Sequence, residues 1–375
     1  MSRTTVPTGG AMQRRSSRRR LRHLLTGAAV TVVAATLAAC SPAEGAATPA
    51  QTGPAGELRL GYFANVTHAP ALVGVGRGLF AARLKAAGTP TLTTQVFNAG
   101  PAAIEALNAG AVDAAFVGPN PAINGFIQSS GDALRIVAGS TSGGAQLVVR
   151  TGITSVHDLV GTDLATPQLG GTQDVALRSW LHDQGLRSPL SGGGDVTITP
   201  TDNAQTFQLF TDHRIDGAWL PEPWASRLVL EGGAHVLVDE KDLWPGGSFV
   251  TTQLIVSRRY LAAHPDTVRA LLQGLQDSVD WLHANPGSAA GAVNAQLVAT
   301  GGKPLSDQVL ARAFAETAFS TDPLAATLKT SLAHAVAAGT AHQASIDGIY
   351  DLRLLNELRR QSATAPVSAA GLGKE

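Results

Sequence analysis

Five short segments of the chain are built largely from Gly, Pro, Asn, Ser and Thr, and each follows an apolar stretch typical of a strand. They are residues 65–70, 99–101, 118–121, 140–144 and 170–173. His68 carries the only side chain in these segments that can be charged. Free backbone N–H groups at the start of a helix, with the helix dipole, favour an anion. Together the segments predict a site that binds a small oxyanion through neutral donors, although any one of them could be an ordinary helix start.

Alternating short strands and helices must position these segments. The predicted strands are 57–63, 91–98, 112–117 and 134–138 in a first set, and 162–166, 195–199 and 215–220 in a second set. From residue 258 onward the pattern is mostly helical, with segments 266–285, 288–300, 306–319, 323–339 and 350–360. This alternation predicts an α/β fold with parallel sheets and helices on both faces. In such sheets ligands bind at the carboxyl ends of the strands.

The first forty residues have the layout of an export signal. Seven Arg residues and no acid precede an apolar stretch, 24–39, which ends in Leu-Ala-Ala-Cys40. The stretch is short for a stable membrane span, so we expect a cleaved signal over residues 1–39. Leu-Ala-Ala-Cys resembles the bacterial lipobox, which implies that the Cys40 sulfur carries a lipid and that residues 40–56 form a flexible tether. The sequence leaves three points open. Export could follow the Sec or the Tat route, translation could start at Met12, and the signal could be an ordinary one that happens to end in Cys.

The composition of the exported part narrows the function classes. Removing the signal takes away seven of the 28 basic residues and none of the 28 acidic ones, so the mature chain is acidic and shows no nucleic-acid surface. About 320 residues remain after the tether, which predicts two lobes. Cys40 is the only cysteine, and the His residues lack metal-ligand spacing. We expect no metal, no cofactor and a monomer, and a disordered tail over 361–375.

Several of these motifs together resemble a known family. They are Gly61-Tyr-Phe, residues 65–70, residues 139–144, Gly171-Thr-Gln and Pro221-Glu-Pro-Trp. In this order and spacing they resemble the periplasmic substrate-binding proteins of ABC importers, in the branch for aliphatic sulfonates, taurine and nitrate. The resemblance covers about residues 57–360.

The family resemblance implies a type II periplasmic-binding-protein fold of two α/β lobes joined by two crossover strands. Lobe 1 would comprise 57–147 and 253–360 and lobe 2 would comprise 148–252, with crossings near 145–150 and 251–257. A small organic anion would bind between the lobes and close them, and the closed form would be recognised by a membrane permease with its ATPase subunit.

The resemblance also implies site residues. Those of lobe 1 would be Asn65, Thr67, His68, Asn120, Ser140, Thr141 and Ser142. Those of lobe 2 would be Thr166, Gly171, Thr172, Gln173, Glu222 and Trp224. Backbone N–H groups of Gly143, Gly144 and Thr172 suit a sulfonate, and Trp224 could cover a ligand tail. Structural readings stay open for His68, for the pair Thr172 and Gln173, and above all for Glu222, because a carboxylate beside an anion costs free energy.

Three other function classes compete with an anion-binding protein. The same fold could bind a neutral pyrimidine or another thiamine precursor, although aromatic residues are few. Enzymes of related fold carry a Cys-rich motif, which this chain lacks, and the chain has no nucleophile elbow and no Walker loop. We therefore expect no enzyme. A structural lipoprotein would leave the five Gly- and Pro-rich segments unexplained.

Overall fold

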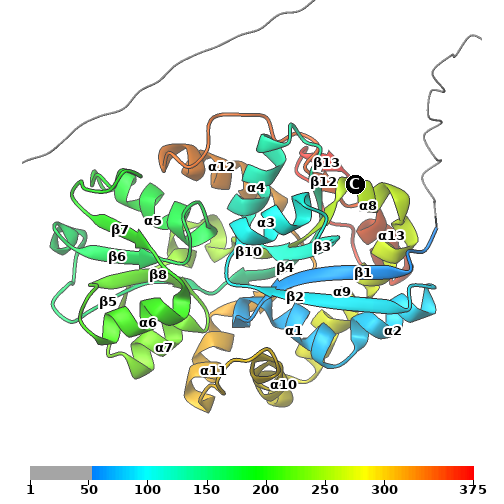
Figure 1. Ribbon diagram of the computed structural model, residues 1–375, viewed down its shortest axis with the longest axis horizontal. Helices are drawn as coiled ribbons and strands as arrows, with labels where there is room; N and C mark the ends of the chain where they lie inside the picture. The colour runs from blue at the N-terminus through cyan, green and yellow to red at the C-terminus, as the bar shows by residue number, and fades with distance from the viewer. Residues whose placement is uncertain (1–52) are drawn as a thin grey trace, which may run out of the picture. The chain divides into compact units, whose positions relative to one another are not determined.

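The computed structural model describes residues 53–375, and these contain two β-sheets. We call the part built on the larger sheet lobe 1 and the part built on the smaller sheet lobe 2 (Figure 1). The predicted signal, Cys40 and the tether up to residue 52 lie outside the described residues. Within the described range, no helix has the length and apolar character needed to cross a membrane.

The sheet of lobe 1 has the order β13-β12-β4-β10-β3-β1-β2, with β11 paired to β4. Its strands are β1 (Glu57–Phe63), β2 (Thr91–Phe97), β3 (Ala114–Val117), β4 (Leu134–Gly143), β10 (Val250–Ser257), β11 (Thr317–Phe319), β12 (Tyr350–Asp351) and β13 (Gly373–Lys374). β1 is parallel to β2 and β3, whereas β10 runs antiparallel between β3 and β4. The carboxyl ends of β1 to β4 and the amino end of β10 therefore lie at one edge.

Helices cover both faces of this sheet. They are η1 (Val66–His68), α1 (Ala69–Gly76), α2 (Leu79–Ala86), α3 (Gly100–Asn108), α4 (Pro119–Gln128), α8 (Arg258–Ala263), α9 (Pro265–Ala284), α10 (Pro286–Ala299), α11 (Asp307–Ala315), η5 (Ala325–Thr327), α12 (Leu328–Ala337) and α13 (Arg353–Gln361). α1 and α2 lie on one face, and α3 and α4 lie on the other (Figure 1). In α9, Val268, Leu271, Leu275 and Val279 are buried, and their spacing of three to four residues forms the apolar stripe of a core-facing helix.

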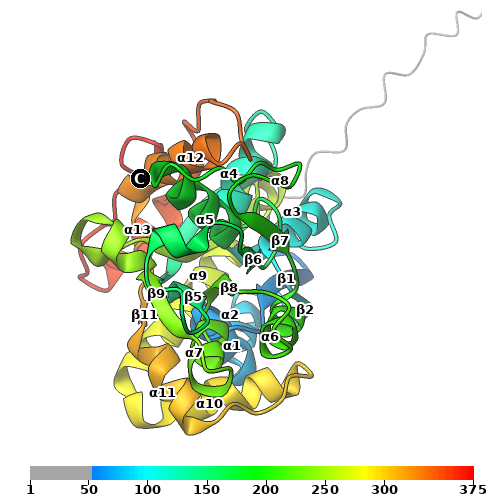
Figure 2. The ribbon, with the colours of Figure 1, turned by 90° about the vertical axis from the view of Figure 1, so that its left-hand side faces the viewer.

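The sheet of lobe 2 has the order β7-β6-β8-β5-β9. Its strands are β5 (Ala145–Val149), β6 (Asp163–Thr166), β7 (Thr197–Pro200), β8 (Gly217–Pro221) and β9 (His235–Asp239). Its helices are η2 (Val156–Leu159), α5 (Thr172–Asp183), α6 (Asn203–Thr211), α7 (Trp224–Glu231), η3 (Glu240–Leu243) and η4 (Pro245–Gly247). α5 covers one face, and α6 and α7 cover the other (Figure 2). β6 is parallel to β7 and β8, so the three strands end at one edge.

The chain passes from lobe 1 to lobe 2 at Gly143 and Gly144. β4 ends at Gly143 and belongs to the first sheet, and β5 begins at Ala145 and belongs to the second. Gly143 and Gly144 both have φ +74, a conformation that side chains disfavour. The chain returns between η4 and β10, since β10 pairs only with strands of lobe 1. The two sheets thus place both passages a few residues before the segments 145–150 and 251–257 suggested by the sequence.

The α/β fold class, with two lobes and a mostly helical C-terminal part, is confirmed. Two details differ from the sequence-based expectation. Residues 361–375 are ordered, because Val367, Ala369 and Leu372 are buried in the core of lobe 1 and β13 pairs with β12. The predicted helix 306–319 ends early, because its last residues form β11 and complete the edge of β4.

Candidate functional site

A small cavity lies where the carboxyl ends of the parallel strands of both lobes face each other. Its volume is about 30 Å³, on the scale of two or three water molecules by the usual measure of about 10–15 Å³ each. Its lining comprises Phe63, Asn65, Thr67, His68, Asn98, Ala99, Gly100, Gly118, Pro121, Pro167, Gly171, Thr172, Gln173, Asn203, Pro221, Thr251 and Thr252. We call this space the inner cavity. Lobe 1 and lobe 2 both contribute to it, as expected for a ligand site in an α/β sheet protein.

The described lining of the inner cavity offers many hydrogen-bond donors to an anion and no charged side chain. Among the described residues, no Asp, Glu, Lys or Arg lines it. Helices α3, α4, α5 and α6 each contribute their first residue or the residue before it to the lining. The amino ends of helices carry partial positive charge and unpaired N–H groups. These four ends differ, because α3 and α4 hold Pro, which has no N–H, in their first two positions and Asp202 caps α6 by accepting from the Ala204 N–H at 3.0 Å. The uncapped start of α5 is therefore the one that most favours a small anion.

The start of α5 supplies three consecutive residues to the lining of the inner cavity. Gly171 precedes the helix and, within residues 53–375, no side chain caps it. Thr172 and Gln173 follow, and each is 8% exposed. The acid of the first turn, Asp174, is turned away: its carboxylate accepts hydrogen bonds from Thr166 Oγ1 (2.9 Å) and from Arg178 Nε (3.1 Å). The first N–H groups of α5 are thus left for a ligand.

Gly118 of lobe 1 lies directly against Thr172 of lobe 2. A Cβ atom on Gly118 would lie 2.1 Å from Thr172 Oγ1 and 3.4 Å from the carbonyl oxygen of Thr251. Gly118 has φ −75, which any residue adopts, so the close approach rather than the backbone conformation requires glycine here.

His68 is held neutral in the wall of the inner cavity. It is 2% exposed, and burial lowers its pKa to about 3. The backbone N–H of Phe63 donates to His68 Nδ1 at 3.3 Å, which assigns the proton of the neutral ring to Nε2. His68 is therefore a neutral donor, and the ring packs on Phe63 with 4.3 Å between ring centroids.

Two polar atoms of the lining are buried without a partner. Thr252 Oγ1 and Asn203 Oδ1 make no hydrogen bond to any described residue, and Thr252 is fully buried. An unpaired buried polar group costs free energy, commonly about 1–3 kcal/mol. A bound ligand would remove this cost at Thr252, whose hydroxyl can donate, and at Asn203 once its side-chain amide is turned.

Direct hydrogen bonds already join the lobes at the rim of the site. Trp224 Nε1 of lobe 2 donates to Asn65 Oδ1 of lobe 1 at 3.0 Å. The backbone N–H of Thr67 donates to the carbonyl oxygen of Glu222 at 3.4 Å. These contacts describe lobes that are closed on each other.

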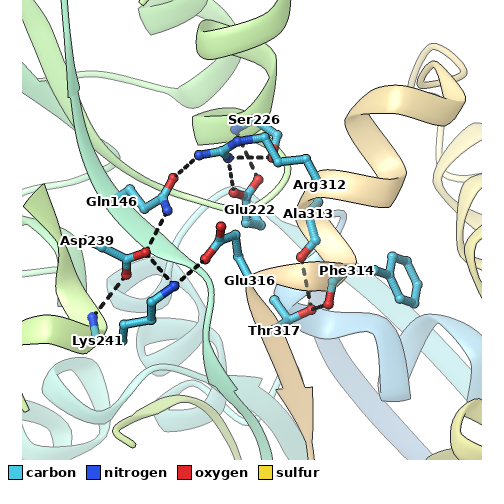
Figure 3. Close-up of polar contacts among 10 residues, drawn as sticks. All are labelled: Gln146, Glu222, Ser226, Asp239, Lys241, Arg312, Ala313, Phe314, Glu316 and Thr317. Carbon is cyan, nitrogen blue, oxygen red and sulfur yellow. Dashed lines mark hydrogen bonds and ion pairs between the residues drawn. The ribbon is translucent and has the colours of Figure 1, made fainter. Parts of the chain in front are cut away.

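A polar network joins the lobes beside the first passage of the chain (Figure 3). Arg312 of α11 donates through Nη1 to Glu222 Oε1 (2.9 Å) and Ser226 Oγ (2.8 Å), and through Nη2 to Gln146 Oε1 (2.6 Å). Glu222 is fully buried, and burial raises its pKa to about 7 while Ser226 and Arg312 act in the opposite direction. The carboxylate is thus committed to Arg312 rather than to the inner cavity.

A second ion pair of the same network comes from η3. Lys241 Nζ lies 2.9 Å from Asp239 Oδ2 and 3.0 Å from Glu316 Oε2, and Gln146 Nε2 donates to the same Asp239 oxygen at 2.9 Å. Glu316 follows α11 in lobe 1, whereas the other groups belong to lobe 2. The network therefore ties α11 and the residue that follows it to β5, α7 and η3.

A comparison with models of protein families matches residues 51–299, more than half of the chain, to the NMT1-like family. The chain belongs to the NMT1-like family. The family resemblance drawn from the sequence is confirmed.

Individual relatives match a shorter part of the chain. A protein of Escherichia coli strain K12 named for binding aliphatic sulfonates is 30% identical over 185 residues, which are 48% of this chain and 52% of that protein. The taurine-binding periplasmic protein of the same strain is 25% identical over 196 residues, which are 52% of this chain and 59% of that protein. The chain thus spans little more than half the length of the curated relatives it matches.

Solved structures extend the match over most of the chain. The alkanesulfonate-binding protein SsuA from Xanthomonas axonopodis pv. citri, bound to MOPS, has a TM-score of 0.63 at 23% identity, covering 78% of this chain and 96% of that chain. At this identity the likeness shows the fold.

Within this family fold, the residues expected in the site fall into two groups. Asn65, Thr67, His68, Gly171, Thr172 and Gln173 line the inner cavity, and Trp224 stands beside it through its bond to Asn65. The residues outside its lining are Asn120, Ser140, Thr141, Ser142, Gly143, Gly144, Thr166 and Glu222.

Contacts of the second group show what they do in the described structure. Asn120 Nδ2 donates to the carbonyl oxygen of Ser331 (3.0 Å), which holds α12 against α4. Thr166 positions Asp174, and Glu222 pairs with Arg312. The segment 140–144 forms the end of β4 and the passage to β5, where it pairs with β10 and β11.

Sequence reasoning missed several residues of the lining. Asn98 and Asn203 follow β2 and β7, and the rule of a strand end opening a helix could have found both. Thr251 and Thr252 lacked such a signal, because they begin a strand instead of ending one. They reach the site because β10 is antiparallel to its neighbours. Within residues 53–375, no cluster of His, Cys, Asp or Glu could hold a metal ion.

Proposed function

We propose that this chain is the extracytoplasmic solute-binding lipoprotein of an ABC importer. It captures a small organic anion, with an aliphatic sulfonate as the first candidate, between its two lobes and delivers it to a membrane permease. The observation that carries the proposal is the inner cavity, in which the uncapped start of α5 meets neutral donors of both lobes and whose described lining holds no Asp, Glu, Lys or Arg. A sulfonate stays ionised at neutral pH and is held well by several neutral donors.

The contacts of the anion follow from the lining. His68 Nε2, the Thr252 hydroxyl and the hydroxyl and N–H groups at the start of α5 donate to the sulfonate oxygens. Thr172 and Gln173 belong to lobe 2, and His68 and Thr252 belong to lobe 1. Because both lobes donate to one anion, the ligand stabilises the closed arrangement over an open one. The closed surface is what the permease and its ATPase subunit select.

The names of the relatives support sulfonate and taurine as ligands, since the compared proteins are named for binding these compounds rather than for a reaction. Nitrate is the second candidate, because a volume of about 30 Å³ suits a small anion. A pyrimidine is disfavoured as the occupant of the inner cavity, since its ring is too large for that space.

The test is isothermal titration of the purified mature chain with methanesulfonate, taurine, nitrate and a pyrimidine. One anion per chain should bind, and Thr172→Ala should weaken binding by at least about tenfold, which is about 1.4 kcal/mol. The matched control is Thr330→Ala, on the exposed side of α12, which should bind as the unchanged chain does. Binding of the pyrimidine alone would reject the proposal.

Lipid attachment at Cys40 is tested separately. Cells fed radiolabelled palmitate should label the unchanged chain, and Cys40→Ala should abolish the label and release the protein from the membrane fraction. Labelling that persists in Cys40→Ala would contradict a lipid on this sulfur. Retention of an unlabelled protein in the membrane would contradict the anchor.

A further inference from the structure

A second and larger cavity adjoins the inner cavity, and we call it the outer cavity. Its volume is about 590 Å³, and it shares the lining residues Asn65, Asn98 and Asn203 with the inner cavity. The three amides therefore line both spaces, and we call the place where they lie the neck. Ligand pockets for small molecules commonly measure about 300–1,000 Å³. Of these two cavities, only the outer one therefore has the volume for an organic group.

The lobe 2 wall of the outer cavity is a stack of flat groups. The guanidinium carbon of Arg227 lies 4.4 Å from the ring centre of Phe207 and 4.8 Å from that of Trp224. Glu231 accepts from Arg227 Nε at 2.9 Å, so the positive charge of the stack is already paired. The wall thus offers a flat, polarisable surface, and the charge of Arg227 within it is paired with Glu231.

The lobe 1 wall combines apolar side chains with Lys303. Val96, Phe97, Leu297 and Leu305 line it, and Val96 is 39% exposed. A group that covered Val96 and the Trp224 ring at once would remove apolar surface from water on both sides.

Trp224 connects this wall to the neck. Its Nε1 donates to Asn65 Oδ1 at 3.0 Å, and Asn65 lines both cavities. The indole is therefore fixed beside the neck, where the first atoms of a tail would leave the anionic head.

We propose that the two cavities are one site in two parts, and that the ligand is a sulfonate whose tail carries an aromatic ring. The inner cavity takes the charged head, the three amides surround the link, and the ring lies in the outer cavity against Phe207 and Trp224. This inference rests on the proposed function, because it needs the anion in the inner cavity. It narrows the substrate class, since methanesulfonate and taurine would leave the outer cavity to water.

The test compares methanesulfonate with 2-phenylethanesulfonate by isothermal titration of the mature chain. The phenyl compound should bind at least about tenfold more tightly, because the ring loses contact with water against two walls. In Phe207→Leu, which keeps an apolar group but removes the flat ring, this affinity ratio should fall at least about threefold. Phe126→Leu is the matched control, since Phe126 lines neither cavity, and it should keep the ratio.

The outcomes separate this inference from the proposed function. If neither sulfonate binds, the proposed function fails. If methanesulfonate binds and the phenyl compound gains less than about twofold, the outer cavity is no tail site. If the ratio of the two affinities is unchanged in Phe207→Leu, the ring lies elsewhere. If an n-alkyl sulfonate of equal length binds as tightly as the phenyl compound, the site does not select aromatic tails.

Discussion

Gly118 of lobe 1 lies so close to Thr172 of lobe 2 that a Cβ atom on Gly118 would stand 2.1 Å from Thr172 Oγ1. Carbon and oxygen atoms that are not bonded cannot approach to this distance. A methyl group at position 118 would therefore force the Thr172 side chain to turn or the lobes to move apart at the edge of the inner cavity.

The change Gly118→Ala should keep the lobes apart and weaken anion binding. The backbone at φ −75 accepts Ala, so folding itself should survive. We expect an affinity at least about thirtyfold lower, which is about 2 kcal/mol, and a larger radius of gyration with ligand present. Titration and small-angle X-ray scattering measure the two effects.

The matched control is Gly291→Ala in α10. A Cβ atom there meets no other atom within 4 Å, so affinity should stay unchanged and stability should rise slightly, by about 0.5–1 kcal/mol. Unchanged affinity in Gly118→Ala would mean that ligand capture does not require this approach of the lobes.

The hydrogen bond from Trp224 Nε1 to Asn65 Oδ1 should couple the lobes measurably. Trp224→Phe removes the donor and keeps an aromatic ring, and Asn65→Ala removes the acceptor. Because a neutral hydrogen bond contributes about 0.5–1.5 kcal/mol, each change should weaken binding severalfold. In the double variant the losses should not add, with a coupling energy of about 1 kcal/mol in a double-mutant cycle of titrations. Strictly additive losses would show that the bond is absent from the bound state.

The carboxyl of Glu222 should make stability depend on pH. Burial raises its pKa from 4.5 to about 7, so between these values the folded chain binds more protons than the unfolded chain. This contribution to stability is full below about pH 4.5 and is lost as pH rises to about 7. The whole shift corresponds to about 3 kcal/mol.

Glu222→Gln should therefore flatten the pH dependence of unfolding. Denaturant unfolding at pH 5 and pH 8 gives the change of the free energy of unfolding with pH. Comparison with the unchanged chain removes the effect of Glu240, another buried acid whose pKa burial raises to about 7. Glu105→Gln, on the exposed side of α3, is the control. Parallel pH curves for Glu222→Gln and the unchanged chain would contradict the role of burial at Glu222.

Asn120 should matter for stability rather than for the ligand. It is 3% exposed, and its amide satisfies the carbonyl oxygen of Ser331. Asn120→Ala removes this bond, which the Ser331 carbonyl accepts in addition to its hydrogen bond within α12, so the free energy of unfolding should fall by about 0.5–1.5 kcal/mol while affinity at low temperature stays within about twofold. A large loss of affinity without a loss of stability would return Asn120 to the ligand site.

The sequence predicted the strand ends well, because the residues that end a strand and open a helix are local. Segments 65–70, 99–101, 118–121 and 170–173 all contribute to the inner cavity, and 140–144 does not. Segment 140–144 joins two strands instead of opening a helix, so no helix start follows it.

Side-chain direction and long-range packing could not be predicted in the same way. Asn120 and Thr172 both occupy the first turn of a helix, yet one turns to α12 and the other to the cavity. Which way each turns depends on the neighbouring helix. The partner of Glu222 is Arg312, 90 residues later, and only the packing of α11 on α7 brings them together. The tail 361–375 is ordered for a similar reason, since its few apolar residues fit a core formed by distant elements.

The most direct test of an anion site between the lobes is a crystal structure of the mature chain with methanesulfonate. We expect the sulfonate in the inner cavity, with oxygens about 3 Å from Thr172 Oγ1 and His68 Nε2. An ordered sulfonate bound anywhere else, with the inner cavity holding only water, would contradict it.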